Sequence, residues 1–244
     1  MHKIYGEEKS ARDTIRFLEN YVERIKNDGR KHRSFFAKNW IKKLAPTKVL
    51  DYGCGWGIGF PFWDDSQKEL YGYEPDINSL EICKVFLDHC NLEVKLYGNS
   101  EEISADFDMV VSLQVLEHVI NIGDYFSGIR SALRDDGHLI LSTPNIINPV
   151  SIASGFKSGD VAKWQEKTFS NYQNVHTHIN TWDLFHLSNL LAAHGFEIEL
   201  FEFCEGMRIP GINRKLYWNF WPFYNFQSNL IILAKKISSS VLHA

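Results

Sequence analysis

The stretch Lys48-Val-Leu-Asp-Tyr-Gly-Cys-Gly-Trp-Gly57 decides how the rest of this 244-residue sequence is interpreted. A short apolar run ends in an acid, Asp51, and three glycines follow at every second position. Such a run is typical of a buried strand that turns into a tight loop, because glycine allows unusual backbone angles and the close approach of a ligand. In open α/β sheets, ligands bind outside the carboxyl ends of the strands. We therefore predict a strand over 47–52 followed by a nucleotide-binding loop.

The spacing of the glycines and of a second acid narrows the type of ligand. A dinucleotide fingerprint has the pattern Gly-x-Gly-x-x-Gly with a phosphate on the next helix, whereas the last gap is one residue shorter here. Glu74 ends the next predicted strand, 69–73, and lies 23 residues after Asp51. An acid at that place accepts both ribose hydroxyls of a nucleoside. A nucleoside without phosphates and with a positive group near Asp51 fits this pattern, and S-adenosylmethionine is such a molecule.

Four motifs in this order resemble those of the class I S-adenosylmethionine-dependent methyltransferases, in the small-molecule branch that includes the ubiquinone-type O-methyltransferases. The motifs are VLDYGCGWG (49–57), YGYEPD (71–76), FDMVVSLQVLEHV (107–119) and LRDDGHLILSTPN (133–145). The resemblance covers about residues 46–145, with a weaker match at 178–184 and 193–196. It implies a doubly wound α/β fold with a seven-stranded, mostly parallel sheet of the Rossmann-like methyltransferase type. It also implies S-adenosyl-L-methionine as methyl donor and S-adenosyl-L-homocysteine as product.

The alternation of apolar runs and helical patterns predicts the same architecture from the residues. Further strands are predicted at 92–96, 109–113, 138–142, 196–203 and 228–234. Helices are predicted at 76–90 and 123–133, and a third begins at Thr181 as N-cap and ends at Gly195. Strands that alternate with helices of this length are typical of βαβ units and a parallel sheet. The resemblance implies that the last strand runs antiparallel beside the fifth.

Two regions lie outside this minimal plan. Residues 1–45 predict an N-terminal helical cap, with helices at 10–27 and 32–44, before a methyltransferase domain over 46–244. Within that domain, insertions are predicted at about 146–180 and 205–226, at places where long insertions are usually functional. The second insertion is rich in aromatic residues: Tyr217, Trp218, Phe220, Trp221, Phe223, Tyr224 and Phe226. We interpret it as a substrate lid, with an aromatic cluster closing a core or a homodimer face as the alternative.

The resemblance implies a role for each residue around the predicted cofactor site. Asp51 orients the amino group of the methionine moiety, directly or through water. Gly53 and Gly55 let the backbone approach that moiety and the ribose. Glu74 accepts hydrogen bonds from the ribose, and Pro75 shapes the turn beneath the adenine.

Three further cofactor contacts are expected on the loops after the third and fourth strands. The resembled family commonly has an Asp that accepts from the adenine amino group, and here Asn99 and Ser100 stand at that place. The amide oxygen of Asn99 would then be the acceptor. Gln114 is either a contact to the methionine side or a hydrogen-bond partner of the substrate. A catechol-type metal site would need an Asp at the end of the fourth strand, where Ser112 and Leu113 stand, so we predict no metal.

Histidines are the candidates for a general base, because the imidazole changes its charge near neutral pH. The pair His176 and His178 precedes the helix predicted from Thr181, and we predict that one of them acts on the acceptor. The resemblance implies a local structural role for His178 as the alternative. The Glu117–His118 pair mainly braces its loop in that family, with a direct role as the alternative. His32 is a further candidate base.

Composition limits the partners of the chain. The hydrophobic content of 44% is enough for one α/β core. No run of 18 apolar residues and no signal-peptide pattern occurs, so no membrane span and a cytoplasmic location are expected. Four cysteines without paired spacing suit reduced thiols. Residues 1–48 carry a net charge of +7 and the remainder −11. We interpret this balance as two solvated amphipathic helices, with a basic cap that attracts an anionic acceptor as the alternative. The overall net charge of −4 makes nucleic acid an unlikely partner.

The sequence therefore predicts a cytoplasmic, metal-independent methyltransferase that acts on a small polar metabolite. Its acceptor is expected to be a hydroxyl of a sugar, of a phosphorylated or nucleotide-linked sugar, or of a secondary metabolite. Two alternatives remain open at this point. One is an RNA or protein methyltransferase that docks through the basic helices, and the other is a non-catalytic cofactor-binding partner subunit.

Overall fold

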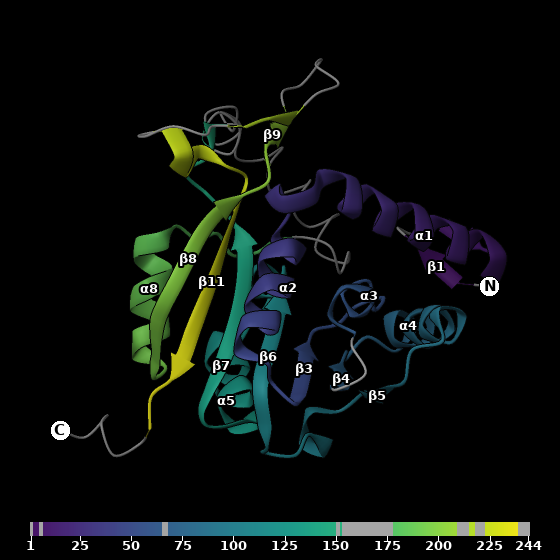
Figure 1. The fold of residues 1–244 in the computed structure, drawn as a ribbon, viewed down its shortest axis with the longest axis horizontal. Helices are drawn as coiled ribbons and strands as arrows, with labels where there is room; N and C mark the ends of the chain where they lie inside the picture. Colours follow the sequence, from purple (N-terminus) through teal and green to yellow (C-terminus); the bar gives the residue numbers. More distant parts are fainter. Residues whose placement is uncertain are drawn as a thin grey trace, which may run out of the picture.

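The computed structural model describes residues 2–4, 7–64, 68–149, 152, 178–208, 215–217 and 223–238. Its centre is a seven-stranded sheet with the strand order β5-β4-β3-β6-β7-β11-β8. Within the sheet, β11 runs antiparallel to β7 and β8, and the other pairings are parallel (Figure 1). The strands are β3 (Lys48–Tyr52), β4 (Glu69–Tyr73), β5 (Val94–Tyr97), β6 (Phe107–Leu113), β7 (Leu133–Pro144), β8 (Phe196–Cys204) and β11 (Asn229–Lys236). The predicted seven-stranded, mostly parallel sheet is confirmed.

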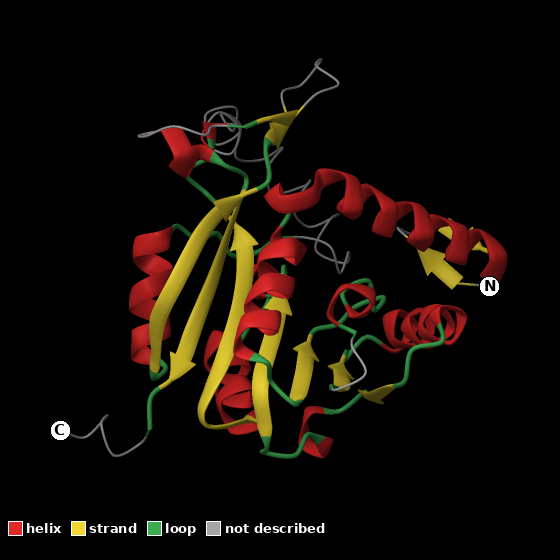
Figure 2. Ribbon diagram, in the orientation of Figure 1, coloured by secondary structure: helices red, strands yellow, loops and turns green. Residues whose placement is uncertain are grey.

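The central strands are apolar on both faces because helices cover both sides of the sheet (Figure 2). In β6, Met109 and Val111 join the core on one face, and Val110 joins the core on the other. In β11, Ile231 and Ile232 divide in the same way. This period of two follows from the pleat of the strand. It explains why these strands are recognised in the sequence as continuous apolar runs.

Each face of the sheet has its own set of helices. The core of one face includes side chains of α1 (Ala11–Asp28), α2 (Arg33–Leu44), α3 (Phe60–Trp63) and α4 (Ile77–Cys90). The core of the other face includes side chains of α5 (Ile122–Ala132) and α8 (Leu184–Ala193). Helices therefore lie on both faces, as the prediction of a doubly wound sheet requires.

The helix ends carry the capping residues that such ends need, since the first backbone N–H groups of a helix have no partner within it. Ser10 accepts a hydrogen bond from the N–H of Asp13 (3.2 Å), and Asp76 accepts one from the N–H of Ser79 (2.8 Å). Gly195 follows α8 with a φ of 74°, as expected for a residue after a helix C-terminus.

The start of α8 differs from the prediction. The N-cap is Asp183, whose carboxylate accepts from the N–H of His186 (3.0 Å), and Thr181 is not the N-cap. Trp182 forms a β-bridge with Asn145, and its carbonyl oxygen accepts from the N–H of Ile146 (3.0 Å). The chain is therefore still extended at residue 182, and the helix begins after it.

The predicted helices of residues 1–45 share one core with the sheet. Ala37, Trp40 and Ile41 of α2 are buried in the core of the first face, and α1 lies beyond the carboxyl ends of β3 and β4 (Figure 1). The division into a cap and a methyltransferase domain stays a prediction. None of the described helices is long and apolar enough to span a bilayer.

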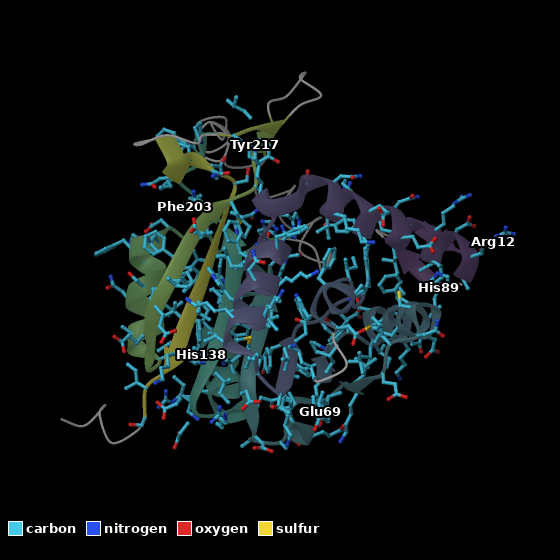
Figure 3. All side chains as sticks on the ribbon, viewed as in Figure 1. Arg12, Glu69, His89, His138, Phe203 and Tyr217 are labelled. Atoms are coloured by element: carbon cyan, nitrogen blue, oxygen red, sulfur yellow. The ribbon has the colours of Figure 1, made fainter. Side chains whose placement is uncertain are left out.

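The predicted insertions are described in part. Residues 153–177 of the first lie outside the described residues, as do Trp218, Phe220 and Trp221 of the second. Tyr217 lies under the ammonium group of Lys31, 3.9 Å from the ring centroid, at the end of the molecule opposite Glu69 (Figure 3). The remaining short elements are β1 (His2–Ile4), β2 (Glu7–Lys9), β9 (Met207–Arg208), β10 (Lys215–Leu216), η1 (Gly29–Lys31), η2 (Ser100–Glu102), η3 (Leu116–His118) and η4 (Phe223–Phe226).

The shared core gives a test of the boundary at residue 45. Ile41 is 2% exposed, whereas Leu44 of the same helix is 36% exposed. We expect Ile41→Ala to lower the free energy of unfolding by about 2–5 kcal/mol and to shift one common transition, because a buried cavity is left behind. Leu44→Ala is the matched control and should cost less than about 1 kcal/mol. Urea unfolding followed by circular dichroism measures both. A separate early transition, with the main one unmoved, would show that residues 1–45 fold on their own.

Candidate active site

A cavity of about 690 Å³ opens at the carboxyl ends of β3, β4 and β6, within the size range of small-molecule sites. The turns that follow these strands form its floor, and α1 and the start of α2 form a wall. Its described lining comprises Tyr21, Ile25, Arg33, Ser34, Asp51, Gly53, Cys54, Gly55, Trp56, Ile58, Gly59, Trp63, Glu74, Pro75, Asp76, Ser79, Leu113, Gln114, Val115, His118, Val119, Ile120 and Ile179. The structure thus brings together Asp51, Gly53, Gly55, Glu74, Pro75 and Gln114 of the predicted cofactor residues.

The loop after β3 needs glycine for two different reasons. Gly53 has a φ of 87°, and a Cβ there would lie 2.6 Å from a methyl carbon of Val115, so the position is both strained and closed to a side chain. Gly55 has a φ of 54°, and no atom lies within 4 Å of where its Cβ would be. Because Gly55 lines the cavity, this open space faces the ligand site. The loop therefore offers bare backbone to a ligand at Gly55.

Asp51 places a carboxylate at the bottom of the cavity. The residue is 5% exposed, and no described residue donates a hydrogen bond to its side chain. Burial raises the pKa of Asp51 well above its ordinary value, and the nearby Glu74 raises it further. A cationic group bound beside Asp51 would reverse this effect, because an opposite charge favours the ionised carboxyl group.

Glu74 ties the turns after β3 and β4 together. One carboxylate oxygen accepts from the N–H of Gly55 (2.9 Å), and the other accepts from the N–H of Asp76 (3.0 Å). Burial raises the pKa of Glu74, and these two hydrogen bonds oppose the increase. Each carboxylate oxygen has a further lone pair, so Glu74 can still accept two hydroxyl donors from the cavity.

Asn99 and Ser100 do not line the cavity. Asn99 is the N-cap of η2, and its amide oxygen accepts from the N–H of Glu101 (3.1 Å). The oxygen that the sequence assigns to the adenine amino group is thus engaged locally. The role of both residues in cofactor binding stays a prediction.

Gln114 has an unusual backbone conformation for a residue other than glycine. Its φ is 60°, in the left-handed region, and its N–H donates to the carbonyl oxygen of Ser142 (2.9 Å). Its side-chain amide donates to the hydroxyl of Ser142 (3.3 Å). Strained residues of this kind cluster at functional sites. The left-handed backbone angle turns the chain away from the line of β6 at Gln114, which lines the cavity.

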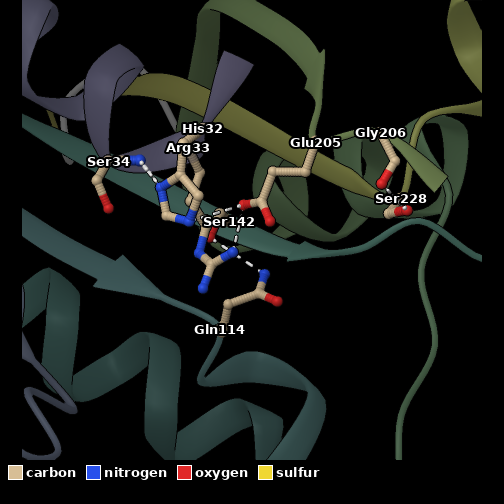
Figure 4. Close-up of polar contacts among 8 residues, drawn as sticks. All are labelled: His32, Arg33, Ser34, Gln114, Ser142, Glu205, Gly206 and Ser228. Carbon is tan, nitrogen blue, oxygen red and sulfur yellow. Dashed lines mark hydrogen bonds and ion pairs between the residues drawn. The ribbon is translucent and has the colours of Figure 1, made fainter. Parts of the chain in front are cut away.

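Arg33 is a cavity residue that the sequence analysis did not single out among the basic residues of 1–48. Its guanidinium donates to the carboxylate of Glu205, which lies 172 residues away, and it lies between Glu205 and Gln114 (Figure 4). The side chain is 16% exposed. Burial lowers the pKa of Arg33, but Glu205 and other nearby groups more than offset this, so the pKa is raised overall and the group stays charged. The cations at Arg30, Lys31 and Arg33 were the available signal in the sequence. They do not show that the side chain of Arg33 points into the cavity.

The loop after β6 is held against residues 178–180. The carbonyl oxygen of Glu117 accepts from the N–H groups of Ile179 (2.8 Å) and Asn180 (3.1 Å). The ring of His178 consequently packs edge-on against the ring of His118, with centroids 4.9 Å apart. His118 lines the cavity, whereas His178 is exposed and is not among the described lining residues, so the pair lies where the cavity meets solvent, which we call its mouth. His178 is thus near the candidate site, whereas His176 lies outside the described residues.

The carboxyl group of Glu117 is fully buried. The residue is 0% exposed, and neither carboxyl oxygen has a hydrogen bond of normal geometry to a described residue, although Arg33 and Thr143 lie close enough to oppose the effect of burial on its pKa. Burial raises its pKa from 4.5 to about 7. Glu117, His118 and His178 also bring three possible metal-ligand atoms within 4.8 Å of one another. The expectation that the protein holds no metal was argued from the end of β6 and stays a prediction.

His32 is held by contacts at both ring nitrogens. Nδ1 accepts from the N–H of Ser34 (3.2 Å), and Nε2 lies 3.5 Å from a carboxylate oxygen of Glu205 (Figure 4). Because Nδ1 accepts, a neutral ring carries its proton on Nε2 and points it toward Glu205. His32 therefore caps α2 and braces Glu205, an arrangement that does not suit a base acting on the acceptor.

A family model described as "Methyltransferase domain" matches residues 13–200. Among curated relatives, the ubiquinone biosynthesis O-methyltransferase of Bradyrhizobium diazoefficiens is 28% identical over 105 residues, which is 42% of either chain. The enzyme of the same name from Nitrobacter winogradskyi is 25% identical over 155 residues, which is 62% of this chain and 55% of the relative. The chain spans about half the length of the curated relatives it matches.

Solved structures show the same fold. An S-adenosylmethionine-dependent methyltransferase from Clostridium acetobutylicum matches with a TM-score of 0.58 and 12% identity, covering 91% of this chain and 98% of that one. Magnesium protoporphyrin IX methyltransferase from Synechocystis, with bound S-adenosylhomocysteine, matches with a TM-score of 0.52 and 15% identity, covering 95% and 90%. At these identities the likeness concerns the fold.

The buried Glu117 predicts a pH-dependent stability. Its pKa is about 7 in the folded chain and ordinarily 4.5. The folded state thus holds the proton more tightly, and the free energy of unfolding falls as pH rises from about 4.5 to about 7 and stays low above that. We expect Glu117→Gln to be about 3 kcal/mol more stable than the natural chain at pH 9 and equal to it at pH 4. Urea unfolding at both pH values measures this, and an equal difference at both would contradict it.

Proposed function

The chain belongs to the methyltransferase domain family, and we propose that it transfers a methyl group from S-adenosylmethionine to a hydroxyl of a small metabolite. The observation that carries the proposal is the cavity in which Asp51, Gly55 and Glu74 meet at the carboxyl ends of β3 and β4. The name of the curated relatives, ubiquinone biosynthesis O-methyltransferase, supports oxygen as the acceptor atom.

The residues of the cavity fit the cofactor of this family. S-Adenosylmethionine supplies, when bound, a methyl group activated by a sulfonium centre. A cationic amino group beside Asp51 would favour the ionised carboxylate, so Asp51 and Arg33 would then present opposite charges to the amino and carboxylate groups of a methionine moiety. Glu74 would accept from the ribose hydroxyls, and Pro75 would lie against the adenine. Gly55 leaves the space that the nucleoside needs.

We assign the acceptor to the part of the cavity that apolar residues of α1 and of the loop after β6 line. Tyr21 and Ile25 of α1 face it, as do Val119, Ile120 and Ile179 at its mouth. Two basic residues before α2 already have partners within the protein, since Arg33 pairs with Glu205 and Lys31 covers Tyr217. Apolar walls favour an acceptor with an apolar body. Among the predicted acceptors, we therefore favour a phenolic or other secondary-metabolite hydroxyl over a phosphorylated sugar.

We assign removal of the acceptor proton to the histidines at the cavity mouth. Methyl transfer mainly needs alignment of the acceptor with the methyl group in a dry pocket, and a base is useful for a hydroxyl acceptor. His178 packs on His118, and both burial and His118 lower the pKa of His178, which favours the neutral ring that accepts a proton. His176 remains a predicted second candidate. We further propose that the reaction needs no metal.

We place the protein in the cytoplasm. Its four cysteines, Cys54, Cys83, Cys90 and Cys204, form no disulfide, as is usual in a reducing compartment.

The cofactor site is tested by Glu74→Ala. Loss of two charge-assisted hydrogen bonds to the ribose should weaken binding of S-adenosylhomocysteine by at least about 100-fold. Isothermal calorimetry measures the affinity. Glu69→Ala is the matched control, because Glu69 lies at the exposed amino end of the same strand and should leave the affinity unchanged. Unchanged affinity in Glu74→Ala would exclude this site.

The acceptor class is tested by supplying S-adenosylmethionine with a panel of catechol-type phenols and of nucleotide-linked sugars. We expect release of S-adenosylhomocysteine with a phenol and none with the sugars, because the mouth is apolar. The assay is repeated with EDTA to test independence from a metal ion. Turnover of the sugars, or loss of turnover with EDTA and its return with Mg²⁺, would contradict the corresponding proposal.

The proposed base is tested by His178→Ala with the best acceptor of that panel. Turnover should fall by about 10²–10⁴-fold, while the affinity for S-adenosylhomocysteine measured by calorimetry stays the same. His186→Ala is the control, since His186 is exposed on α8 and pairs with Asp183. Full turnover in His178→Ala would remove this residue from the mechanism.

A further inference from the structure

Glu205 occupies a backbone conformation that normally selects glycine. Its φ is 62°, just after β8, and Gly206 follows it directly. Two backbone hydrogen bonds hold it there: its N–H donates to the carbonyl oxygen of Lys31 (2.9 Å), and its carbonyl oxygen accepts from the N–H of Ser228 (2.9 Å). A left-handed conformation at a residue other than glycine or asparagine is a strain that the surroundings must impose. Since glycine would adopt this conformation without strain, the presence of Glu205 indicates that its carboxylate is required here.

The carboxylate of Glu205 faces both Arg33 and His32. One carboxylate oxygen accepts from the guanidinium of Arg33, and the same oxygen lies 3.5 Å from Nε2 of His32 (Figure 4). His32 is fixed by the hydrogen bond that Nδ1 accepts from Ser34, so its Nε2–H is the donor that faces Glu205. The Glu205 side chain is 12% exposed, and its orientation is thus determined from two sides.

The contact leaves part of the Arg33 guanidinium for the cavity. An arginine carries five N–H donors in a rigid fork, and the contact with Glu205 uses the nitrogen Nη1. Arg33 lines the cavity together with Gln114 and Asp51, and in Figure 4 it lies between Glu205 and Gln114. A long arginine side chain loses much rotational freedom when it is held in one place. Glu205 holds it there before a ligand arrives.

We propose that Glu205 is a positioning residue, which holds Arg33 in the orientation that receives the carboxylate of the methionine moiety. The proposal rests on the cofactor site proposed above. Glu205 lies 172 residues after Arg33 in the sequence and does not itself line the described cavity. Its effect on a ligand must therefore pass through the guanidinium, and it must be confined to ligands that carry the carboxylate.

Two ligands separate this role from a general structural one. S-Adenosylhomocysteine carries the amino acid end, whereas 5′-methylthioadenosine has the same nucleoside without it. Calorimetry with the full chain should show that Glu205→Ala binds S-adenosylhomocysteine at least about tenfold more weakly and methylthioadenosine within about twofold of the natural chain. Arg33→Gln should give the same pattern. Glu205→Gln should restore at least the natural affinity, because its amide oxygen keeps the contact with Arg33.

Glu197→Ala, at the exposed start of β8, is the matched control and should change neither affinity. Equal weakening of both ligands by Glu205→Ala would show a structural role and overturn the proposal. Unchanged binding of S-adenosylhomocysteine in Glu205→Ala or Arg33→Gln would also overturn it. If the natural chain binds neither ligand, the cofactor site itself is wrong and the role of Glu205 falls with it. If Glu205→Ala does not fold, Arg33→Gln and Glu205→Gln still decide the outcome.

Discussion

The carboxylate of Glu74, which accepts the backbone N–H groups of Gly55 and Asp76, is the contact on which the candidate site depends. It joins the turns after two neighbouring strands, and the N–H groups of Gly53 and Cys54 reinforce it by donating to the carbonyl oxygen of Tyr73. These bonds hold the glycine loop in its left-handed conformation. The loop is thus preorganised, which lowers the entropic cost of binding a nucleoside.

The candidate site gathers buried acids and strained backbone angles, which lower the stability of the fold. Asp51 and Glu117 are buried acids whose pKa values burial raises, and Gln114 and Glu205 hold left-handed backbone angles. Each of these features costs stability. Asp51, Gln114 and Arg33, the partner of Glu205, line the cavity, and Glu117 lies in the loop that includes the cavity residue His118. Local costs that gather at one cavity are a sign of function, because a fold selected for stability alone would remove them.

Much of the fold could be predicted from the sequence because its signals are local. Strands buried on both faces are continuous apolar runs, and the glycine loop and Glu74 lie at the ends of two such runs. The start of α8 could not be predicted, because the β-bridge that keeps Trp182 extended comes from Asn145, far away in sequence. Arg33 could not be singled out for the same reason, since its partner Glu205 is 172 residues away. For Asn99, the sequence could not show that η2 engages its amide oxygen.

The carbonyl oxygen of Glu117 accepts two hydrogen bonds, from the N–H groups of Ile179 and Asn180. They anchor the far end of the connection between residues 149 and 178 directly to the loop after β6. The position of His178 is therefore set by the loop after β6. Because both bonds join backbone groups, they do not depend on the side chain of Ile179. That side chain can therefore change while the histidine pair keeps its place.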